Sequence, residues 1–355
     1  MRVALVHDYL TQRGGAERVV LALHRLFPDA PIYTSVWDPD RTFREFRSAT
    51  VHTSVLQRLP PQGFRWWLPF YPLVFEHFDL DDYDLVISSS SGWAHGARTA
   101  GRHVVYCHNP ARWLYQQAAY FADGGPAPMW TAKVLLPLLG ALRRWDSFVA
   151  RRPTTYIANS HVVAGRIARI YRRTAAVVHP PVDLDRMARV RRGLARHYLV
   201  VARLLPYKRV DLALQACARR NAPVVVVGDG PARAALERSA PSCATFVGRV
   251  DDATLTELYG GARALIHAGE EDFGIVPLEA MAAGVPVVAY AAGGALETMI
   301  DGVTGALFDA QDEPSLSAAL DRLESMRWDP TVLRARASEF SEERFHTRML
   351  EALAS

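Results

Sequence analysis

Residues 264–284 read ALIHAGEEDFGIVPLEAMAAG, and this stretch predicts a strand, a loop and a helix in succession. Its apolar beginning has the length of a buried strand. Pro277 suits the first helical position, because its missing N–H would have no partner there, and Gly284 suits the C-terminal cap. Glu271 is therefore expected in the loop and Glu279 in the first helical turns.

The start of this predicted helix offers a place for an anion. Backbone amides around Gly274 and Ile275 would be left unpaired at the positive end of the helix dipole, where a phosphate can accept their hydrogen bonds. Glu271 and Glu279 put one carboxylate on each side, which suits a ligand with hydroxyls at both ends, such as a nucleotide sugar. The alternative is that Glu279 is a solvated helix residue and Glu271 a capping carboxylate.

Two basic side chains follow another predicted strand. Residues 198–202, YLVVA, precede Arg203 and Lys208, so both cations are expected at a strand's carboxyl end. Ligands of open α/β sheets bind at that edge, and a guanidinium with an ammonium group suits a diphosphate. Either residue alone could be an ordinary surface cation. The diphosphate interpretation gains weight because Glu271 also follows a strand of the same predicted sheet.

Strand-like runs alternate with helical patterns along the chain, which indicates the α/β class with two doubly wound, Rossmann-like domains. Paired prolines within residues 177–183 place the hinge near residue 182. The predicted domains are 1–182 and 183–329, followed by C-terminal helices within 330–355 that either cap the second sheet or cross back to the first domain. The expected strands are 3–6, 32–36, 85–88, 104–107, 156–158, 198–202, 224–227, 245–247, 264–267, 287–289 and 306–308.

The composition fits two domains with buried sheets. The chain has 355 residues, above the usual size of a single core, and 50% of them are hydrophobic. The formal net charge is +4 and the sequence pI is about 9.0, with basic residues scattered among acidic ones. That balance permits an anionic ligand or an anionic membrane surface and does not require nucleic acid.

No targeting or membrane-spanning segment is expected. The N-terminus leads directly into a strand without a signal-peptide core, and the longest apolar stretch, 134–142, is too short to span a bilayer. Cys107, Cys217 and Cys243 lack metal-ligand spacing. The simplest account is a cytoplasmic protein with reduced cysteines.

Two segments at strand ends in the first half are further candidates for ligand contact. Gly14 and Gly15 open a helical pattern after the first strand, where a glycine pair lets an anion approach the backbone; the alternative is an ordinary turn. His108 follows the strand at 104–107 and can donate to a sugar hydroxyl or accept a proton, or be held by a backbone carbonyl for structural reasons. His7 is expected to be structural.

Several other motifs are interpreted as structural. The glycine turns lack the G-x-G-x-x-G spacing of a dinucleotide site, and residues 228–230 are expected to form a turn. Asp252 is expected to cap a helix. Asp-x-Asp patterns at 79–81 and 183–185 have no supporting ligands nearby, so neither a metal site nor a cofactor is predicted.

Residues 64–71, FRWWLPFY, form an unusually aromatic segment with Trp66 and Trp67 at its centre. Such residues can dock at a membrane interface or form a platform for an acceptor. Packing under a long loop of the first domain is the preferred interpretation. Peripheral association with the inner face of the membrane stays open as the alternative.

Taken together, these motifs resemble the retaining glycosyltransferases of family 4, a large group of enzymes with the GT-B fold. The strongest marks are the pair Glu271 and Glu279 with Phe273-Gly274, the cations Arg203 and Lys208, the turn VGDGP at 227–231, and Gly293-Gly294 with Glu297. The first domain, with YCHNPARW at 106–113, is similar to bacterial mannosyltransferases of surface polysaccharide synthesis that use GDP-mannose. Asn109 stands where those enzymes often have threonine.

The resemblance implies a GT-B architecture in which the two domains face each other across a cleft that binds a nucleoside diphosphate sugar. It implies that Arg203 and Lys208 neutralise the donor diphosphate, while backbone amides of Gly14 and Gly15 contact it across the cleft. Glu279 would accept hydrogen bonds from the ribose hydroxyls.

The same resemblance assigns the sugar and base positions. Glu271 would hold hydroxyls of the donor sugar, and His108 would touch that sugar or steer the acceptor hydroxyl. The base would rest near Arg249 and Val250. Sugar and phosphate would be lined, through backbone contacts, by Phe273, Gly274, Ile275 and Val276.

The implied function is metal-independent, retaining transfer of a hexose to a hydroxyl of a saccharide, lipid-linked saccharide or small-molecule acceptor. Mannose and a GDP-sugar donor are favoured, with a UDP-sugar as the alternative. Negative charge grows on the leaving diphosphate as the glycosidic bond breaks, and preorganised cations and amides stabilise it. A GT-B fold sugar-nucleotide epimerase and a non-catalytic nucleotide-sugar-binding protein stay open as other functions.

Overall fold

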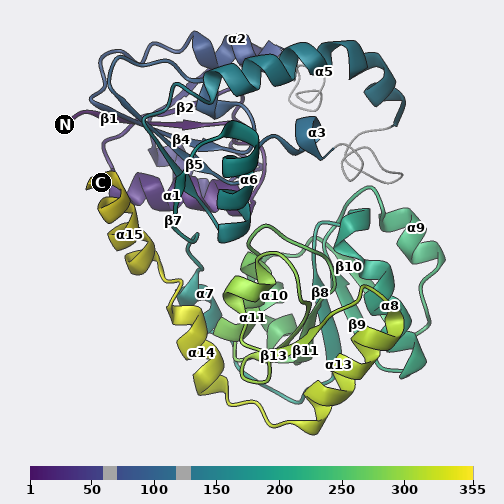
Figure 1. Ribbon diagram of the computed structural model, residues 1–355. Helices are drawn as coiled ribbons and strands as arrows, with labels where there is room; N and C mark the ends of the chain where they lie inside the picture. Colours follow the sequence, from purple (N-terminus) through teal and green to yellow (C-terminus); the bar gives the residue numbers. More distant parts are fainter. Residues whose placement is uncertain (59–69, 117–128, 355) are drawn as a thin grey trace. The chain divides into compact units, whose positions relative to one another are not determined.

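The computed structural model describes residues 1–58, 70–116 and 129–354, with side chains in the last range from residue 139 onward (Figure 1). These residues form two compact units. The first comprises the described parts of Met1–Gln117, Thr131–Pro181 and Glu342–Ser355, and the second is built on Val182–Ser341. The predicted aromatic segment 64–71 lies outside the described residues except for Phe70 and Tyr71.

The first unit is built on a parallel sheet, which has seven strands in the described residues in the order β3-β2-β1-β4-β5-β6-β7. The strands are β1 (Val3–His7), β2 (Ile32–Thr34), β3 (Val51–Thr53), β4 (Leu85–Ser90), β5 (Arg102–Cys107), β6 (Thr155–Ala158) and β7 (Ala175–Val177). Its helices are α1 (Gly15–Leu26), η1 (Arg44–Ser48), η2 (Val55–Arg58), α2 (Tyr71–Glu76), η4 (Ala94–Gly96), α3 (Arg112–Tyr115), α5 (Met129–Val149), α6 (His161–Tyr171) and α15 (Glu342–Ala354).

The second unit is built on another parallel sheet, with the described strands in the order β10-β9-β8-β11-β12-β13. They are β8 (His197–Val201), β9 (Val224–Val227), β10 (Ala244–Gly248), β11 (Ala262–His267), β12 (Val287–Tyr290) and β13 (Gly305–Phe308). The helices are α7 (Leu184–Ala188), η5 (Pro206–Lys208), α8 (Val210–Arg219), α9 (Arg233–Arg238), α10 (Asp252–Gly260), α11 (Ile275–Ala282), α12 (Ala295–Thr298), α13 (Glu313–Ser325) and α14 (Pro330–Ser338).

Each sheet is buried on both faces, as parallel sheets require. In β8, Leu199 belongs to one apolar cluster, whereas its neighbours Tyr198 and Val200 belong to another on the opposite face. The same alternation separates Tyr106 of β5 from Val105 in the first unit. Helices therefore cover both sides of each sheet, and the predicted α/β class is confirmed.

The strand order reverses once in each sheet, and the reversals lie between neighbours that are distant in sequence. In the first sheet this occurs between β1 and β4, and in the second between β8 and β11. Loops at the carboxyl ends of strands on either side of such a reversal diverge, and ligands of open α/β sheets bind there. This topology therefore brings together the loops that carry the predicted site residues.

The chain returns to the first unit at its C-terminal end. Phe345 and Met349 of α15 join the core that also contains residues of α1, and the imidazole Nε2 of His346 lies 2.9 Å from the carbonyl oxygen of Ala22. The preceding helix α14 stays with the second unit, where its Leu333 packs in the core beneath α11. Figure 1 shows α15 beside α1 and α14 near α11.

The predicted strands are present, with ends that differ by at most two residues, and the short strands β3 and β7 were not among them. The predicted start of α11 was wrong by two residues. Its first residue is Ile275, so Pro277 occupies the third helical position. Gly274 precedes the helix with φ of +87°, a conformation that glycine adopts without the strain other residues incur. Gly284, with φ of +72°, follows the C-terminal cap residue Ala283.

Candidate functional site

Lys208 and Glu271 meet at the point of strand reversal in the second sheet. Lys208 ends η5, in the loop after β8, and Glu271 lies in the loop after β11. Lys208 Nζ donates to Glu271 Oε1, and both side chains are mostly buried. A Cβ atom at Gly269 would lie 2.6 Å from the carbonyl oxygen of Tyr207, so only glycine lets the two loops approach this closely. Backbone packing therefore brings together two of the predicted site residues, and their opposite charges form an ion pair.

Two glycines after β12 hold the Glu271 loop from its other side. The amide of Gly294 donates to the Glu271 carbonyl oxygen over 2.8 Å. A Cβ atom at Gly293 would lie 2.2 Å from that oxygen, and one at Gly294 would lie 2.0 Å from the carbonyl oxygen of Phe273. These contacts explain physically why glycines are needed at both positions.

The amino end of α11 begins directly after this loop. Helical geometry leaves the amides of Ile275 and Val276 without intrahelical acceptors, and no side chain caps the helix at Gly274. Beneath it lies His267, the last residue of β11, whose Nε2 would be 3.8 Å from a Cβ atom on Gly274. Burial lowers the pKa of His267 to about 4, with Lys208 acting in the same direction and Glu271 against it. A neutral imidazole therefore underlies the amide donors.

Glu279, one helical turn further along α11, is bound by an arginine that the sequence did not suggest. Arg186 Nη2 donates to Glu279 Oε1, and Nη1 of the same guanidinium donates to Asp252 Oδ1 over 2.5 Å. Asp183 Oδ2 lies 3.8 Å from Arg186 Nε. The side chains of Arg186 and Glu279 are only 13% and 8% exposed, so Glu279 is not a solvated helix residue.

The remaining predicted donor contacts lie on loops at the same edge of the second sheet. Arg203 is exposed in the loop after β8, and Arg249, also exposed, precedes the half-buried Val250 after β10. The intervening β9 loop ties these loops together, since the Leu204 amide donates to the Asp229 carbonyl over 3.1 Å and the Gly228 amide donates to the Gly248 carbonyl over 2.7 Å.

The expected helix cap at Asp252 was wrong. Asp251 is the N-cap of α10, and its carboxylate accepts from the Thr254 amide over 2.8 Å. Asp252 is the first helical residue, which leaves its carboxylate free to bind Arg186. Adjacent aspartates at a helix start cannot be told apart from sequence, because either can supply the capping oxygen.

In the first unit, the predicted glycine pair lies at the start of α1, after β1. Gly14 is the N-cap and Gly15 the first helical residue. The Gly14 amide already donates to Glu17 Oε2 over 3.1 Å, and the Glu17 side chain is almost fully buried. Of the two predicted amide donors, Gly15 is therefore the one that the helix geometry leaves available.

His108 follows β5 directly and is half-buried. Its Nε2 lies 2.8 Å from Ser89 Oγ at the end of β4. Burial, assisted by the nearby His7, lowers the pKa of His108 to about 3, so this imidazole is neutral at physiological pH.

The Asp-x-Asp patterns have structural partners. Asp183 caps α7 by accepting from the Arg186 amide over 3.1 Å, and Asp81 accepts from the Ala100 amide over 2.9 Å. In the described part of the chain, no three His, Cys, Asp or Glu side chains gather as metal ligands would. The three cysteines are free thiols. Within the same described residues, no helix combines the length and the apolar character that crossing a bilayer demands.

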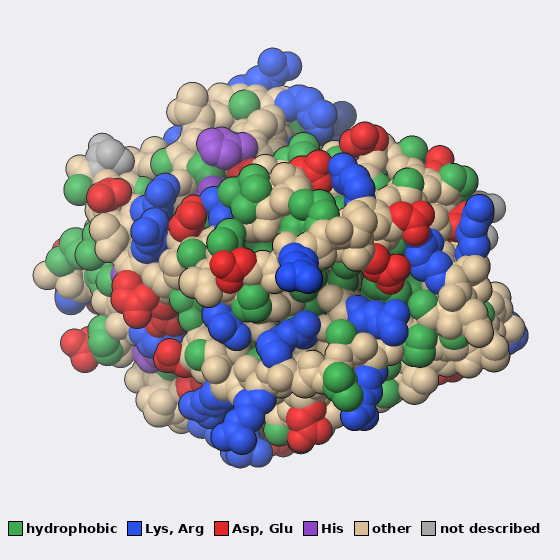
Figure 2. Space-filling view, turned by 90° about the horizontal axis from the view of Figure 1, so that it is seen from below, with side chains coloured by type: hydrophobic (Ala, Val, Ile, Leu, Met, Phe, Trp, Pro, Cys, Tyr) green, Lys and Arg blue, Asp and Glu red, His purple; other side chains and the backbone are tan. Residues whose placement is uncertain are grey.

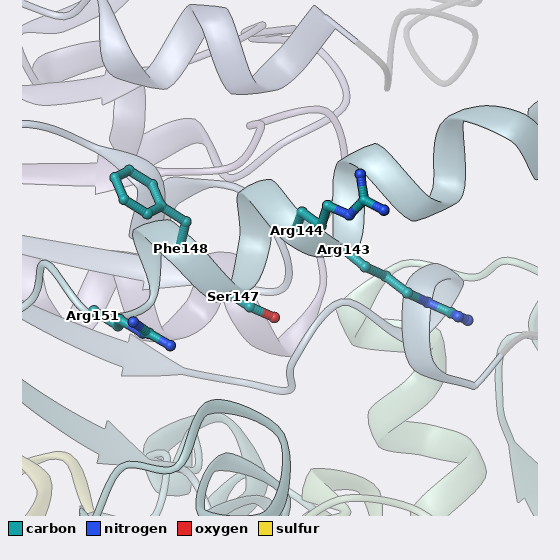
Figure 3. A pocket seen from close by; sticks show the side chains of 5 residues that line it. All are labelled: Arg143, Arg144, Ser147, Phe148 and Arg151. Atoms are coloured by element: carbon teal, nitrogen blue, oxygen red, sulfur yellow. The ribbon is translucent and has the colours of Figure 1, made fainter.

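A hollow of about 380 Å³ lies along the C-terminal part of α5 (Figure 3). Arg143 and Ser147 line it four residues apart on one stripe of the helix, with Arg144 and Phe148 on the next, and Arg151 lies in the turn after the helix. Elsewhere, on the face seen in Figure 2, basic and acidic side chains are interspersed.

Comparison with known proteins follows the same division of the chain. Residues 13–186 match the family model described as Glycosyltransferase Family 4, and residues 190–344 match the one described as Glycosyl transferases group 1. The D-inositol 3-phosphate glycosyltransferase of Mycolicibacterium smegmatis is 28% identical over 313 residues, 80% of this chain and 66% of the relative. The protein of that name from Mycobacterium sp. (strain KMS) is 32% identical over 295 residues, which are 76% of this chain and 62% of that relative. The chain thus spans less than two thirds of the length of these relatives.

Solved structures share the fold over nearly the whole chain. Anabaena HepE in complex with UDP and glucose matches with a TM-score of 0.70 and 20% identity, covering 100% of both chains. Sucrose-phosphate synthase from Thermosynechococcus elongatus matches with a TM-score of 0.74 and 18% identity, covering 100% of this chain and 98% of that one.

The two parallel-sheet units are those of a GT-B fold, which confirms the predicted architecture. The chain carries a Glycosyltransferase Family 4 domain followed by a Glycosyl transferases group 1 domain. Both family models are described as those of glycosyltransferases, and the named relatives are glycosyltransferases.

Sequence analysis missed four side chains that contact the candidate site residues. Arg186 and His267 do so in the second unit, and Glu17 and Ser89 in the first. His267 could have been found, because it ends a predicted strand. Glu17 could also have been found, because it lies three residues after the helix N-cap Gly14. Arg186 and Ser89 act through tertiary contacts that carry no local signal.

Proposed function

We propose that this protein transfers a hexose from a nucleoside diphosphate sugar to an acceptor hydroxyl, with retention of anomeric configuration. The observation that carries the proposal is the grouping of Lys208, Glu271 and the amino end of α11 where the second sheet reverses its strand order. A cation, a carboxylate and unpaired amides are together suited to a sugar attached to a diphosphate. The proposal follows the domains and relatives described above.

Each group has a role in this proposal. Lys208 and Arg203 bind the diphosphate together with the amides of Ile275 and Val276, and they stabilise the charge that grows on it as the glycosidic bond breaks. Glu271 accepts hydrogen bonds from donor-sugar hydroxyls. Because Lys208 and Glu271 neutralise each other in the free protein, donor binding exchanges one strong pair for two ligand contacts.

The nucleoside is assigned to the neighbouring loops. Glu279 accepts from the ribose hydroxyls, and the base lies against the backbone of Arg249 and Val250. Phe273 and Gly274 add backbone contacts near the sugar and phosphate. In the first unit, the proposal assigns anion binding to the amides at Gly14 and Gly15, of which Gly15 is available, and hydroxyl recognition to His108.

The donor is proposed as GDP-mannose or a UDP-hexose. The first-unit motif is similar to mannosyltransferases that use GDP-mannose, whereas the solved neighbour HepE is in complex with UDP and glucose. Thermal-shift titration with GDP, UDP, ADP and dTDP separates these donors, because only the preferred base will raise the midpoint at low concentration. The acceptor is proposed as a hydroxyl of a saccharide, a lipid-linked saccharide or a small molecule.

A transfer assay with variants tests the reaction. Lys208→Ala and Arg203→Ala should each lower turnover about 100-fold, since each removes charge stabilisation on the order of 3 kcal/mol. Arg238→Ala, which removes an exposed cation of the same unit, should leave turnover unchanged. NMR of the product gives the anomeric configuration, and an inverted product would reject retention.

Turnover within a factor of two for both loop variants would reject the diphosphate role. The same assay separates the alternative functions. Isomerised nucleotide sugar formed without acceptor would indicate an epimerase, and donor affinity without turnover over many acceptors would indicate a binding protein.

We further propose a cytoplasmic location with peripheral association at an anionic membrane surface, through α5. The hollow on this helix is lined by Arg143, Arg144 and Arg151, and Phe148 beside them is 62% exposed. Arginines on a helix bind anionic headgroups, and an exposed aromatic ring can enter the interface. The Trp145 indole of α5 donates a hydrogen bond to Glu76 of α2, and α2 carries exposed Leu73 and is preceded by exposed Phe70.

Vesicle sedimentation tests this surface. Changing Arg143, Arg144 and Arg151 together to glutamine should weaken binding to phosphatidylglycerol vesicles at least ten-fold, because each basic residue near such a surface contributes about 1 kcal/mol. Changing Arg238, Arg263 and Arg327 to glutamine alters net charge equally on the other unit and should have little effect. If both triple variants lose vesicle binding to the same extent, the attraction is nonspecific and the assignment to α5 is rejected.

A further inference from the structure

Strand β4 ends in three buried serines, and each hydroxyl meets a histidine. Ser88 Oγ lies 2.8 Å from His103 Nε2, and Ser90 Oγ lies 3.4 Å from His95 Nδ1. Ser89 lies between them, so its side chain points to the opposite face of the sheet. There it lies 2.8 Å from His108 Nε2, the histidine proposed to recognise a substrate hydroxyl.

Ser89 also joins His108 to the start of the chain. His7 Nδ1, at the end of β1, lies 3.0 Å from the Ser89 carbonyl oxygen and 3.2 Å from Ser89 Oγ. On its other side, His7 Nε2 lies 3.9 Å from Glu17 Oε1, and Glu17 Oε2 accepts from the Gly14 amide. A buried chain of side chains therefore runs from His108 to the glycine pair at α1.

The positions of the protons in this chain follow from what each atom can do. The Ser89 carbonyl oxygen can only accept, so His7 Nδ1 must carry a proton. The Ser89 hydroxyl oxygen then accepts from the same N–H, and its own hydrogen is directed to His108 Nε2. Nε2 of His108 is therefore an acceptor, and the proton of this neutral ring lies on Nδ1.

The charged groups around His7 are consistent with hydrogen bonds that run from His7 through Ser89 to His108. Burial alone would lower the pKa of His7, but Glu17 and Asp8 outweigh it and the pKa is raised. An imidazolium at His7 still has a proton on Nδ1, so the direction of the hydrogen bonds does not change. The Asp8 carboxylate is held by the amides of Ser91, Trp93 and Ala94, so Glu17 is the carboxylate that faces His7 Nε2.

We propose that Ser89, His7 and Glu17 are positioning residues that fix His108 as the Nδ1–H tautomer, so that it donates a hydrogen bond to a substrate oxygen and does not act as a base. Nδ1 of His108 has no hydrogen-bond partner in the described part of the chain. This inference rests on the proposed function for the ligand that His108 meets. The tautomer itself does not depend on that ligand.

NMR of the whole protein with nitrogen-15-labelled histidine tests the tautomer directly. The His108 resonances are identified by their loss in His108→Gln. The ligand-free wild type should have a protonated Nδ1 and an unprotonated Nε2 on His108 between pH 5 and 8. Ser89→Ala should move the proton toward Nε2, the nitrogen that is protonated preferentially in a neutral histidine side chain in water, while Ser89→Thr should keep the wild-type pattern.

Ser88→Ala is the matched control, because it removes a buried hydroxyl bonded to a histidine over the same distance on the opposite face. It should leave the His108 spectrum unchanged. In the transfer assay, Ser89→Ala should lower kcat/KM about ten-fold and Ser88→Ala should not, since one hydrogen bond of about 1.4 kcal/mol is worth that factor.

The outcomes separate this inference from the proposed function. A proton on His108 Nε2 in the wild type, or an unchanged tautomer in Ser89→Ala, would overturn the inference even if nucleotide sugars bind and react. Absence of nucleotide binding with the expected tautomer would reject the substrate role of His108, while the hydrogen-bond direction would stand.

Discussion

At the scale of single residues, Arg186 changes the interpretation of Glu279. A buried carboxylate requires a partner, and the Arg186 guanidinium serves Glu279 and Asp252 together. It therefore balances the charge of Glu279 and orients its carboxylate, which a side chain that binds ribose hydroxyls needs. We infer that Arg186 is a positioning residue for nucleoside binding.

Replacing Arg186 by methionine should weaken nucleotide binding about 10- to 100-fold, because a misplaced carboxylate loses hydrogen bonds worth about 1.5–3 kcal/mol. The preference for UDP or GDP over the 2′-deoxynucleotide should shrink in parallel. Isothermal titration calorimetry with both nucleotides measures each quantity.

Arg189→Met is the control for this prediction, since Arg189 is an exposed cation just beyond the same short helix. An Arg186→Met protein that remains folded and keeps its full preference for the ribonucleotide would contradict the positioning role. Uniform weakening for both nucleotides would point to a structural effect alone.

Residue types and their order predicted Glu271, Glu279 and Lys208 as candidates, because Lys208 and Glu271 follow recognisable strands and Glu279 lies in the helix after one of them. The partner of Glu279 could not be predicted. Arg186 lies 93 positions earlier in the chain, on a helix of five residues that gives no periodic signal. A contact of that kind depends on how α7 packs against α11.

At the scale of elements, glycines decide where the Glu271 loop lies. Gly269, within this loop, packs against Tyr207 and Lys208, and Gly293 approaches the loop from the β12 side, both at distances to backbone atoms that exclude a side chain. The loop is thus held between the β8 and β12 loops, and the position of its carboxylate is set by backbone contacts. Preorganisation of this kind is what a charge-stabilising site requires.

Gly293→Ala should reduce affinity for a nucleotide sugar at least ten-fold. Its new Cβ atom would lie 2.2 Å from the Glu271 carbonyl oxygen, so the loop must shift. Gly302→Ala is the matched control, because Gly302 also has a positive φ, +73° against +61°, and nothing lies within 4 Å of its Cβ position.

Both variants should lose about 1–2 kcal/mol of unfolding free energy from the left-handed conformation. Only Gly293→Ala should also lose donor affinity, measured by calorimetry. If both bind donor as the wild type does, the packing of this glycine does not control the site.

Element positions were largely predictable, since buried parallel strands are continuous apolar runs. The start of α11 was not, because Gly274 can either end a loop or cap a helix, and its positive φ is fixed by the strand, loop and helix together. The contact of β4 with β1 was equally hidden, as it joins segments about 80 residues apart.

At the scale of the molecule, both sheets reverse their strand order at the loops that carry the candidate residues. The first sheet places Gly15 after β1 and Ser89 at the end of β4, and the second places Lys208 after β8 and Glu271 after β11. The alternating pattern predicted two such sheets but not their strand order, because order depends on which apolar faces pack together.

Buried neutral histidines should make the fold sensitive to acid. Burial lowers the pKa of His103 and His108 to about 3 and that of His267 to about 4. In the unfolded chain these histidines bind protons near pH 6.5. The free energy of unfolding is therefore undiminished by them above that pH, and it decreases as pH falls toward 4. The effect of His7 on stability has the opposite pH dependence. Its pKa is raised in the folded protein, so its contribution to the free energy of unfolding declines as pH rises.

His103→Gln should therefore reduce the acid dependence of the unfolding free energy by up to about 1.4 kcal/mol per pH unit below pH 6.5. Urea unfolding followed by fluorescence of Trp93, Trp113 and Trp145, which lie in the first unit, measures this slope. A slope equal to that of the wild type would contradict a neutral, buried His103.

The central claim is that a nucleoside diphosphate binds at the carboxyl edge of the second sheet. Hydrogen exchange with saturating UDP or GDP tests it most directly. The account predicts added protection of the amides at 203–208, 249–250 and 274–276, lost in Lys208→Ala. Binding of the preferred nucleotide without any change in these segments would contradict it.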